Sequence, residues 1–177
     1  MKSIMKPVIA IVAAALILLG FKAGLAGMAE ANAAKELNEM LATILPGDTE
    51  FTEEAYDGED EAILAVYKGT TGFVVNTVAY GYAGNIEMLV GVSNDGTVTG
   101  LVVRDLSETY GLGANALTDT DYLAQYLETA GDAEVGSNID AITGATVTSK
   151  AVTRAVNTAV AYVTGADTTS SATTWGE

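Results

Sequence analysis

Hydrophobic and polar residues alternate in four short segments in the middle of the chain. Such alternation is typical of strands that bury one face of a sheet. Glycine-rich stretches and an Asn-Asp-Gly turn separate the segments, so neighbouring strands can pair directly. The pattern predicts an antiparallel meander whose strands are residues 62–67, 73–82, 86–92 and 97–103.

Two helices are predicted on either side of these strands. Residues 29–45 are rich in alanine, carry apolar residues at helical spacing, and are stopped by a Pro-Gly pair. Residues 120–129 predict a short helix with Leu123, Tyr126 and Leu127 facing inward. Both segments would supply apolar faces to the core.

A third helix is predicted from Thr148, where alanine and valine recur every three or four positions up to residue 163. Gly165 follows as a C-terminal cap. This helix presents a face of small residues to the sheet. We therefore expect an α+β fold class, with an antiparallel sheet packed against helices and preceded by one N-terminal transmembrane helix.

Residues 7–28 are apolar except for Lys22, and their number suits the ~20 residues that a spanning helix needs. Lys2 and Lys6 before them favour a cytoplasmic N-terminus. A cleaved signal peptide is the alternative, because small-residue cleavage sites follow. The expected organisation is an N-terminus and membrane anchor, a linker helix, an extracytoplasmic domain and a disordered tail, over residues 1–28, 29–47, 48–165 and 166–177.

Charge and composition exclude several classes of function. Residues 1–29 hold three lysines and no acid, whereas the rest holds all 23 acidic residues and five basic ones, a net charge of −18. Such an acidic surface repels nucleic acid, so we expect no nucleic-acid partner. The chain has no cysteine and no histidine, which excludes thiolate-ligated clusters and His-ligated haem or zinc. Redox chemistry would have to come from an organic cofactor.

Residues 140–149 (Asp-Ala-Ile-Thr-Gly-Ala-Thr-Val-Thr-Ser) lead into the third helix. A helix start exposes unpaired N–H groups and the positive end of the helix dipole, which suits a phosphate. Gly144 and Ala145 leave room for it, and hydroxyls of Thr146, Thr148 and Ser149 crowd the same place. The alternative is that Thr146 or Thr148 is only an N-cap.

This segment resembles the Ser/Thr-Gly-Ala-Thr-x-Thr motif of the FMN-binding domain in the G subunit of Rnf electron-transport complexes and the C subunit of sodium-pumping NADH:quinone reductases. The resemblance implies covalent FMN, joined by a phosphoester bond to the last threonine of the motif, Thr148. It also implies a flavin transferase of the ApbE type, with Asp140 in the sequence that this enzyme recognises or, alternatively, in a turn. Implied FMN contacts in the motif are Thr143, Gly144, Ala145 and Thr146.

Two upstream segments extend the resemblance in the same order. Residues 82–86 (Tyr-Ala-Gly-Asn-Ile) are similar to the family's Gly-Tyr-x-Gly-x-Ile strand, and residues 107–113 to its Glu-Thr-Pro-Gly-Leu-Gly loop near the flavin. Tyr110 stands where the family usually has proline, so the loop lacks a fixed φ angle. Lys150 is a candidate to offset the phosphate charge, although a solvated surface lysine is the alternative. The implied contacts of the loop are Glu108, Thr109, Gly111, Leu112 and Gly113.

The resemblance implies an electron-relay subunit carrying covalent FMN in a membrane-bound, ion-translocating ferredoxin:NAD oxidoreductase complex of the Rnf type. The other subunits of that complex would be its partners, and the chain alone would turn over no substrate. The implied location is the cell membrane, with a single span and the FMN domain on the extracytoplasmic side. The alternatives are a free-standing anchored flavoprotein for extracellular electron transfer and a non-redox anchored binding domain.

Overall fold

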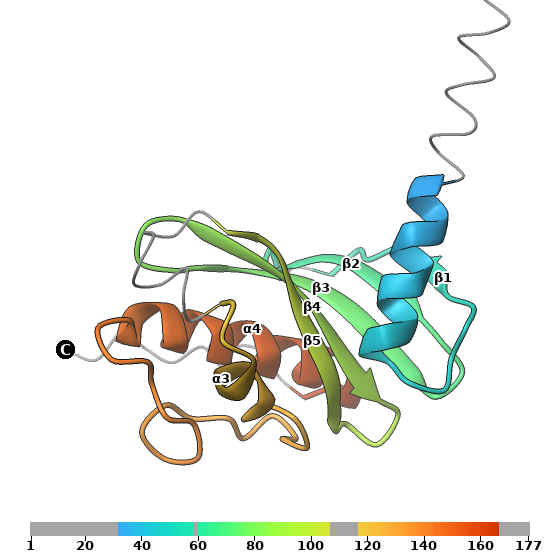
Figure 1. Ribbon diagram of the computed structural model, residues 1–177. Coiled ribbons are helices and arrows are strands. Elements are labelled where there is room, and N and C mark those ends of the chain that lie inside the picture. The colour runs from blue at the N-terminus through green and yellow to red at the C-terminus, as the bar shows by residue number, and fades with distance from the viewer. Residues whose placement is uncertain (1–31, 59, 107–116, 167–177) are drawn as a thin grey trace, which may run out of the picture. The chain divides into compact units, whose positions relative to one another are not determined.

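The computed structural model describes residues 32–58, 60–106 and 117–166 (Figure 1). The chain divides into two compact units, residues 1–39 and 40–177. In the first unit, residues 32–39 are helical, and Lys35 pairs with Glu39 at 3.6 Å between Nζ and Oε1. Within the described ranges, no helix combines the length and the apolar character that a membrane crossing requires. The predicted anchor lies outside those ranges, as does almost all of the predicted tail.

The second unit contains a five-stranded antiparallel sheet, in which strands adjacent in the sequence are adjacent in the sheet. This order confirms the predicted antiparallel meander. The sequence pattern did not predict the first strand, because its three residues, Thr-Glu-Glu, are polar and lie mostly exposed at the edge. The strands are β1 (Thr52–Glu54), β2 (Ile63–Lys68), β3 (Gly72–Tyr80), β4 (Asn85–Ser93) and β5 (Val98–Leu106).

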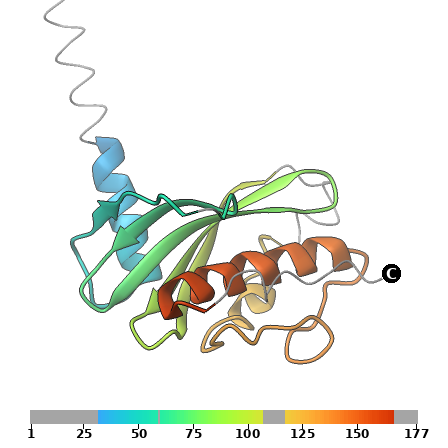
Figure 2. The same cartoon turned by 180° about the vertical axis from the view of Figure 1, so that it is seen from behind.

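Helix α4 (Thr146–Thr164) runs along one face of this sheet (Figures 1 and 2). Its buried face is made of small residues, which let the helix approach the strands closely and share their core with Val75, Met88 and Val90. Gly165, at φ +70°, ends the helix in the left-handed conformation, as predicted. The buried apolar residues of α4 are Ala151, Val152, Ala155, Val156, Ala159, Val160 and Ala161.

The other face of the sheet contacts the end of the helix formed by residues 32–44. Successive strand residues point to opposite faces, so Gly91 faces away from the core residue Val90. The backbone of Ile44 lies against Gly91 and Gly100, where an added Cβ would come within 2.6 and 2.5 Å of its carbonyl oxygen. Thr99 Oγ1 donates to the same oxygen at 2.9 Å. Close approach therefore requires glycine at both positions.

Helix α3 (Thr120–Ala124) is shorter than the predicted helix over residues 120–129. The backbone after α3 pairs with β5 instead: Glu128 donates its N–H to the Val98 carbonyl, and the Val98 N–H donates to Thr129. Tyr126 is fully buried, as predicted, but Leu127 is 41% exposed, so its predicted inward orientation is wrong. Pairing with the strand turns the backbone and directs this side chain outward.

Candidate functional site

The loop before α4 turns sharply at Gly144, which has φ +80°. Ala145 N–H donates to the Ile142 carbonyl at 2.9 Å, and Ala145 itself occupies the N-cap position. Alanine offers no side-chain oxygen to the first N–H groups of the helix, and no side chain caps α4. The helix begins at Thr146. Neither Thr146 nor Thr148 is therefore the N-cap.

The three hydroxyls at this helix start have different surroundings. Thr146 is exposed, whereas Thr148 is 1% exposed and Ser149 is fully buried. Ser149 Oγ donates to the Ala145 carbonyl at 3.0 Å and accepts from the Ile142 N–H at 3.3 Å. Ser149 thus fixes the loop to the helix. Thr146 is exposed at the first residue of the helix.

A buried pair of tyrosines lies against the first two turns of α4. The hydroxyls of Tyr122 and Tyr126 are 2.6 Å apart, and each lies 3.4 Å from the carbonyl oxygen of Ser149. Tyr126 also bonds Thr153 Oγ1 at 2.9 Å, and Thr153 donates to the same carbonyl at 3.0 Å. Burial raises the pKa of both phenols, so they stay neutral at physiological pH. The network holds the helix start in place.

The sequence pattern did not reveal this network. Tyr122 and Tyr126 are four residues apart, a spacing that places two side chains on one helical face. That spacing was the available signal, but it does not indicate the distant partner Ser149.

Asp140 is held by its backbone and not by its carboxylate. Its N–H donates to Gln125 Oε1 at 2.8 Å, and Gln125 Nε2 donates back to the Asp140 carbonyl at 3.5 Å. The Asp140 residue itself is exposed. Its carboxylate is therefore accessible to a second protein.

The structure brings together one of the two groups of predicted FMN contacts. Thr143, Gly144, Ala145 and Thr146 form the turn and the helix start, and Lys150 is exposed one turn further along α4. The second group and the neighbouring Tyr110 lie outside the described residues, so those contacts stay predictions. That group is Glu108, Thr109, Gly111, Leu112 and Gly113.

Comparison with known proteins places this geometry in a family. Residues 81–161 match the FMN-binding domain family. This range includes the β3–β4 turn and α4 up to its last turn. The start of α4 thus lies within the matched domain.

Relatives from three organisms agree, and each is the G subunit of its complex. The chain is 35% identical over 144 residues to that of the ion-translocating oxidoreductase complex of Methanosarcina acetivorans, covering 73% of this chain and 76% of the relative. It is 44% identical over 108 residues to the G subunit of the proton-translocating ferredoxin:NAD(+) oxidoreductase complex of Clostridium ljungdahlii. That match covers 56% of this chain and 58% of the relative. The third relative is the G subunit of the Na(+)-translocating ferredoxin:NAD(+) oxidoreductase complex of Acetobacterium woodii. The chain is 35% identical to it over 139 residues, which cover 74% of this chain and 65% of the relative.

The matches thus span between somewhat more than half and three quarters of these relatives. The match to the Methanosarcina protein is extensive enough to assign the family. The chain belongs to the FMN-binding family that includes the G subunits of ion-translocating oxidoreductase complexes.

Proposed function

We propose that this chain carries FMN covalently, through a phosphoester bond to a threonine at the start of α4, and relays electrons within an Rnf-type ion-translocating ferredoxin:NAD oxidoreductase complex. The observation that carries the proposal is a helix start without a side-chain cap, which bears the motif threonines Thr146 and Thr148, inside the FMN-binding domain. A phosphate ester there would lie near the positive end of the helix dipole.

The motif resemblance points to Thr148, the last threonine of the motif, and we propose the ester there. Thr148 is 1% exposed, so its loading by a transferase would require local movement around the helix start. Thr146, which is exposed two residues earlier, is the alternative.

The residues present fit a phosphate-linked flavin. Gly144 adopts a positive φ that brings backbone close to the helix start, and Lys150 adds a positive charge on the exposed side of α4. When bound, FMN would supply reversible electron acceptance and donation, which no side chain here can provide. The residues of the chain would hold the phosphate, position the ring and limit its exposure to water.

Two further parts of the proposal concern assembly. An ApbE-type transferase would load the FMN, and the exposed Asp140 beside the motif is available for its recognition. Residues 7–28 would anchor the chain in the membrane, with the FMN domain on the extracytoplasmic side. The relatives' names support the other subunits of the complex as partners.

The test uses the full chain, expressed with and without an ApbE-type transferase and measured by intact mass spectrometry. We expect a mass gain equal to FMN less one water only with the transferase, together with flavin absorbance that stays with the denatured chain. The absence of any gain, with a transferase shown to load another substrate, would refute covalent attachment.

Electron relay needs a separate test in membranes that contain the whole complex. We expect a Thr148→Val chain to assemble with the complex and to abolish NAD reduction by reduced ferredoxin. Unchanged NAD reduction in a complex that contains this variant without FMN would refute the relay.

A further inference from the structure

The segment that carries the motif threonines, residues 140–149, is tied to α3 at its first residue. The Asp140 N–H donates to Gln125 Oε1 at 2.8 Å, and Gln125 Nε2 donates to the Asp140 carbonyl at 3.5 Å. Gln125 is the C-cap residue of α3, so one side chain holds the backbone of the segment against a separate helix. The segment cannot leave this position without losing these bonds.

Ser149 holds the other end of the same segment. Its Oγ donates to the Ala145 carbonyl at 3.0 Å and accepts from the Ile142 N–H at 3.3 Å, and its own N–H donates to the Ala145 carbonyl at 2.9 Å. The hydroxyls of Tyr122 and Tyr126 lie 3.4 Å from the Ser149 carbonyl oxygen. Ser149 is thus fixed in position and closes the loop onto the first turn of α4.

Thr148 lies between these two ties, one residue before Ser149, and is 1% exposed. A phosphoryl group joined to its hydroxyl needs space that a closely packed interior does not contain. An enzyme that adds the group must also reach the hydroxyl oxygen. The closed segment therefore opposes modification of Thr148, whereas a locally opened segment would permit it.

Resting on the function proposed above, with the ester at Thr148, we propose that FMN loading is gated by residues 140–149. Gln125 and Ser149 hold this segment closed, and the transferase loads the chain only from a locally opened form in which their bonds are broken. Thr148 Oγ1 then forms a bond to the FMN phosphorus of FAD, the pyrophosphate bond of FAD breaks, AMP leaves, and the hydroxyl proton passes to solvent. Gln125 and Ser149 act through the segment and are positioning residues.

The test measures the rate of mass gain of the full chain with FAD and a limiting amount of transferase. Under this condition the rate follows the population of the open form. Gln125→Met keeps the length of the side chain, removes both bonds to Asp140 and lies outside the motif. Ser149→Ala removes the bonds at the other end. Hydrogen exchange of the residue 149 amide reports opening independently, because this amide donates to Ala145.

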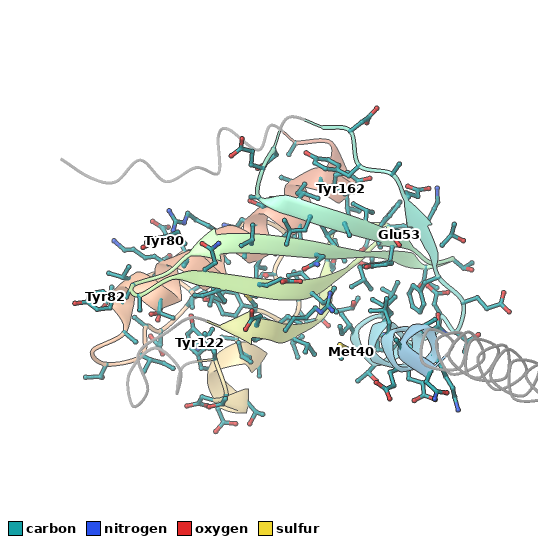
Figure 3. The ribbon with its side chains drawn as sticks, turned by 90° about the horizontal axis from the view of Figure 1, so that it is seen from above. Met40, Glu53, Tyr80, Tyr82, Tyr122 and Tyr162 are labelled. Carbon is teal, nitrogen blue, oxygen red and sulfur yellow. The ribbon has the colours of Figure 1, made fainter. Side chains whose placement is uncertain are left out.

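Asp48→Asn is the matched control, because it removes buried hydrogen bonds elsewhere in the same unit. Asp48 accepts from Thr71, which directly precedes β3. Tyr80 ends β3 at its opposite end. Figure 3 shows Tyr122 of α3 toward the end of the sheet that carries Tyr80 and Tyr82. The control therefore lowers stability without releasing residues 140–149.

We expect Gln125→Met and Ser149→Ala each to raise the loading rate about five- to thirtyfold, the change in population that follows the loss of one or two hydrogen bonds. Exchange of the residue 149 amide should rise by a similar factor, and Asp48→Asn should change neither rate.

Faster exchange in both variants with an unchanged loading rate would overturn the gate, and so would equal acceleration of loading by Asp48→Asn. Unchanged exchange in both variants would overturn it as well, because their bonds would then not hold the segment closed. If neither the parent nor any variant gains mass, with a transferase shown to load another substrate, the proposed function itself is refuted.

Discussion

At the start of α4, three hydroxyl groups within four positions have different roles. The sequence identifies Thr146, Thr148 and Ser149 as candidates, but it does not show which is accessible. Accessibility depends on where the helix begins, and α4 begins at Thr146, two residues before the predicted start. That start leaves Thr146 exposed and buries Thr148 and Ser149. Local pattern thus predicts the three candidates, and packing decides which of them is exposed.

Ser149 offers a direct test of the loop's attachment to the helix. Ser149→Ala removes one bond to the Ala145 carbonyl and one from the Ile142 N–H, at a fully buried position. We expect the free energy of unfolding in urea to fall by about 1–3 kcal/mol. Thr143→Ala, in the exposed part of the same loop, should change it by less than about 0.5 kcal/mol. Equal effects of the two variants would contradict a structural role for Ser149.

Asp48 should make stability depend on acidic pH. Burial raises the pKa of its carboxyl, but hydrogen bonds from the backbone and side chains of Thr71 and Thr70 together more than offset this and lower the pKa. The Thr71 N–H and hydroxyl donate to the carboxylate at 2.9 and 2.8 Å. A carboxyl with a lowered folded-state pKa stabilises fully above its unfolded pKa, and the contribution is lost as pH falls through the folded value.

We therefore expect Asp48→Asn to destabilise the chain at pH 7 and to approach the parent's stability below about pH 4. Urea unfolding at several pH values measures this difference. A stability difference that stays constant between pH 7 and pH 3 would contradict the assignment.

At the scale of elements, side-chain patterning predicted β2 to β5 and α4, because alternating and helically spaced apolar residues decide which face is buried. It did not predict β1, which joins the sheet through backbone bonds to β2. Side-chain patterning also predicted that the short helix continues after residue 124, where the backbone pairs with Val98 instead. Pairing with a distant strand leaves no local pattern. The tyrosine network is a similar case, since its acceptor is a backbone carbonyl 27 residues from Tyr122.

The contact of the Ile44 backbone with β4 and β5 depends on glycine. In Gly100→Ala, the new methyl group would meet the Ile44 carbonyl oxygen at 2.5 Å, and backbone must shift to relieve the clash. We expect a loss of about 1–3 kcal/mol in the free energy of unfolding, measured by urea denaturation. A Gly100→Ala chain as stable as the parent would contradict the tight contact.

At the scale of the whole molecule, the proposed topology can be tested because the chain has no cysteine of its own. A cysteine placed at the exposed position Ser137 should react in intact cells with a maleimide that cannot cross membranes. A cysteine at Ser3 should react only after the cells are opened, because the lysines around it favour the cytoplasmic side. Labelling of both in intact cells, or of the Ser3 cysteine alone, would contradict the proposed orientation.

The proposed attachment of FMN to Thr148 underlies every functional proposal made for this chain. The most direct measurement is the intact mass of Thr146→Val and Thr148→Val chains, each expressed beside the parent with the transferase. Valine matches the shape of threonine, so the helix start should be preserved in both. We expect the gain of FMN less one water in the parent and in Thr146→Val, and no gain in Thr148→Val. A gain in Thr148→Val that is lost in Thr146→Val would contradict this attachment and place the ester on the exposed residue.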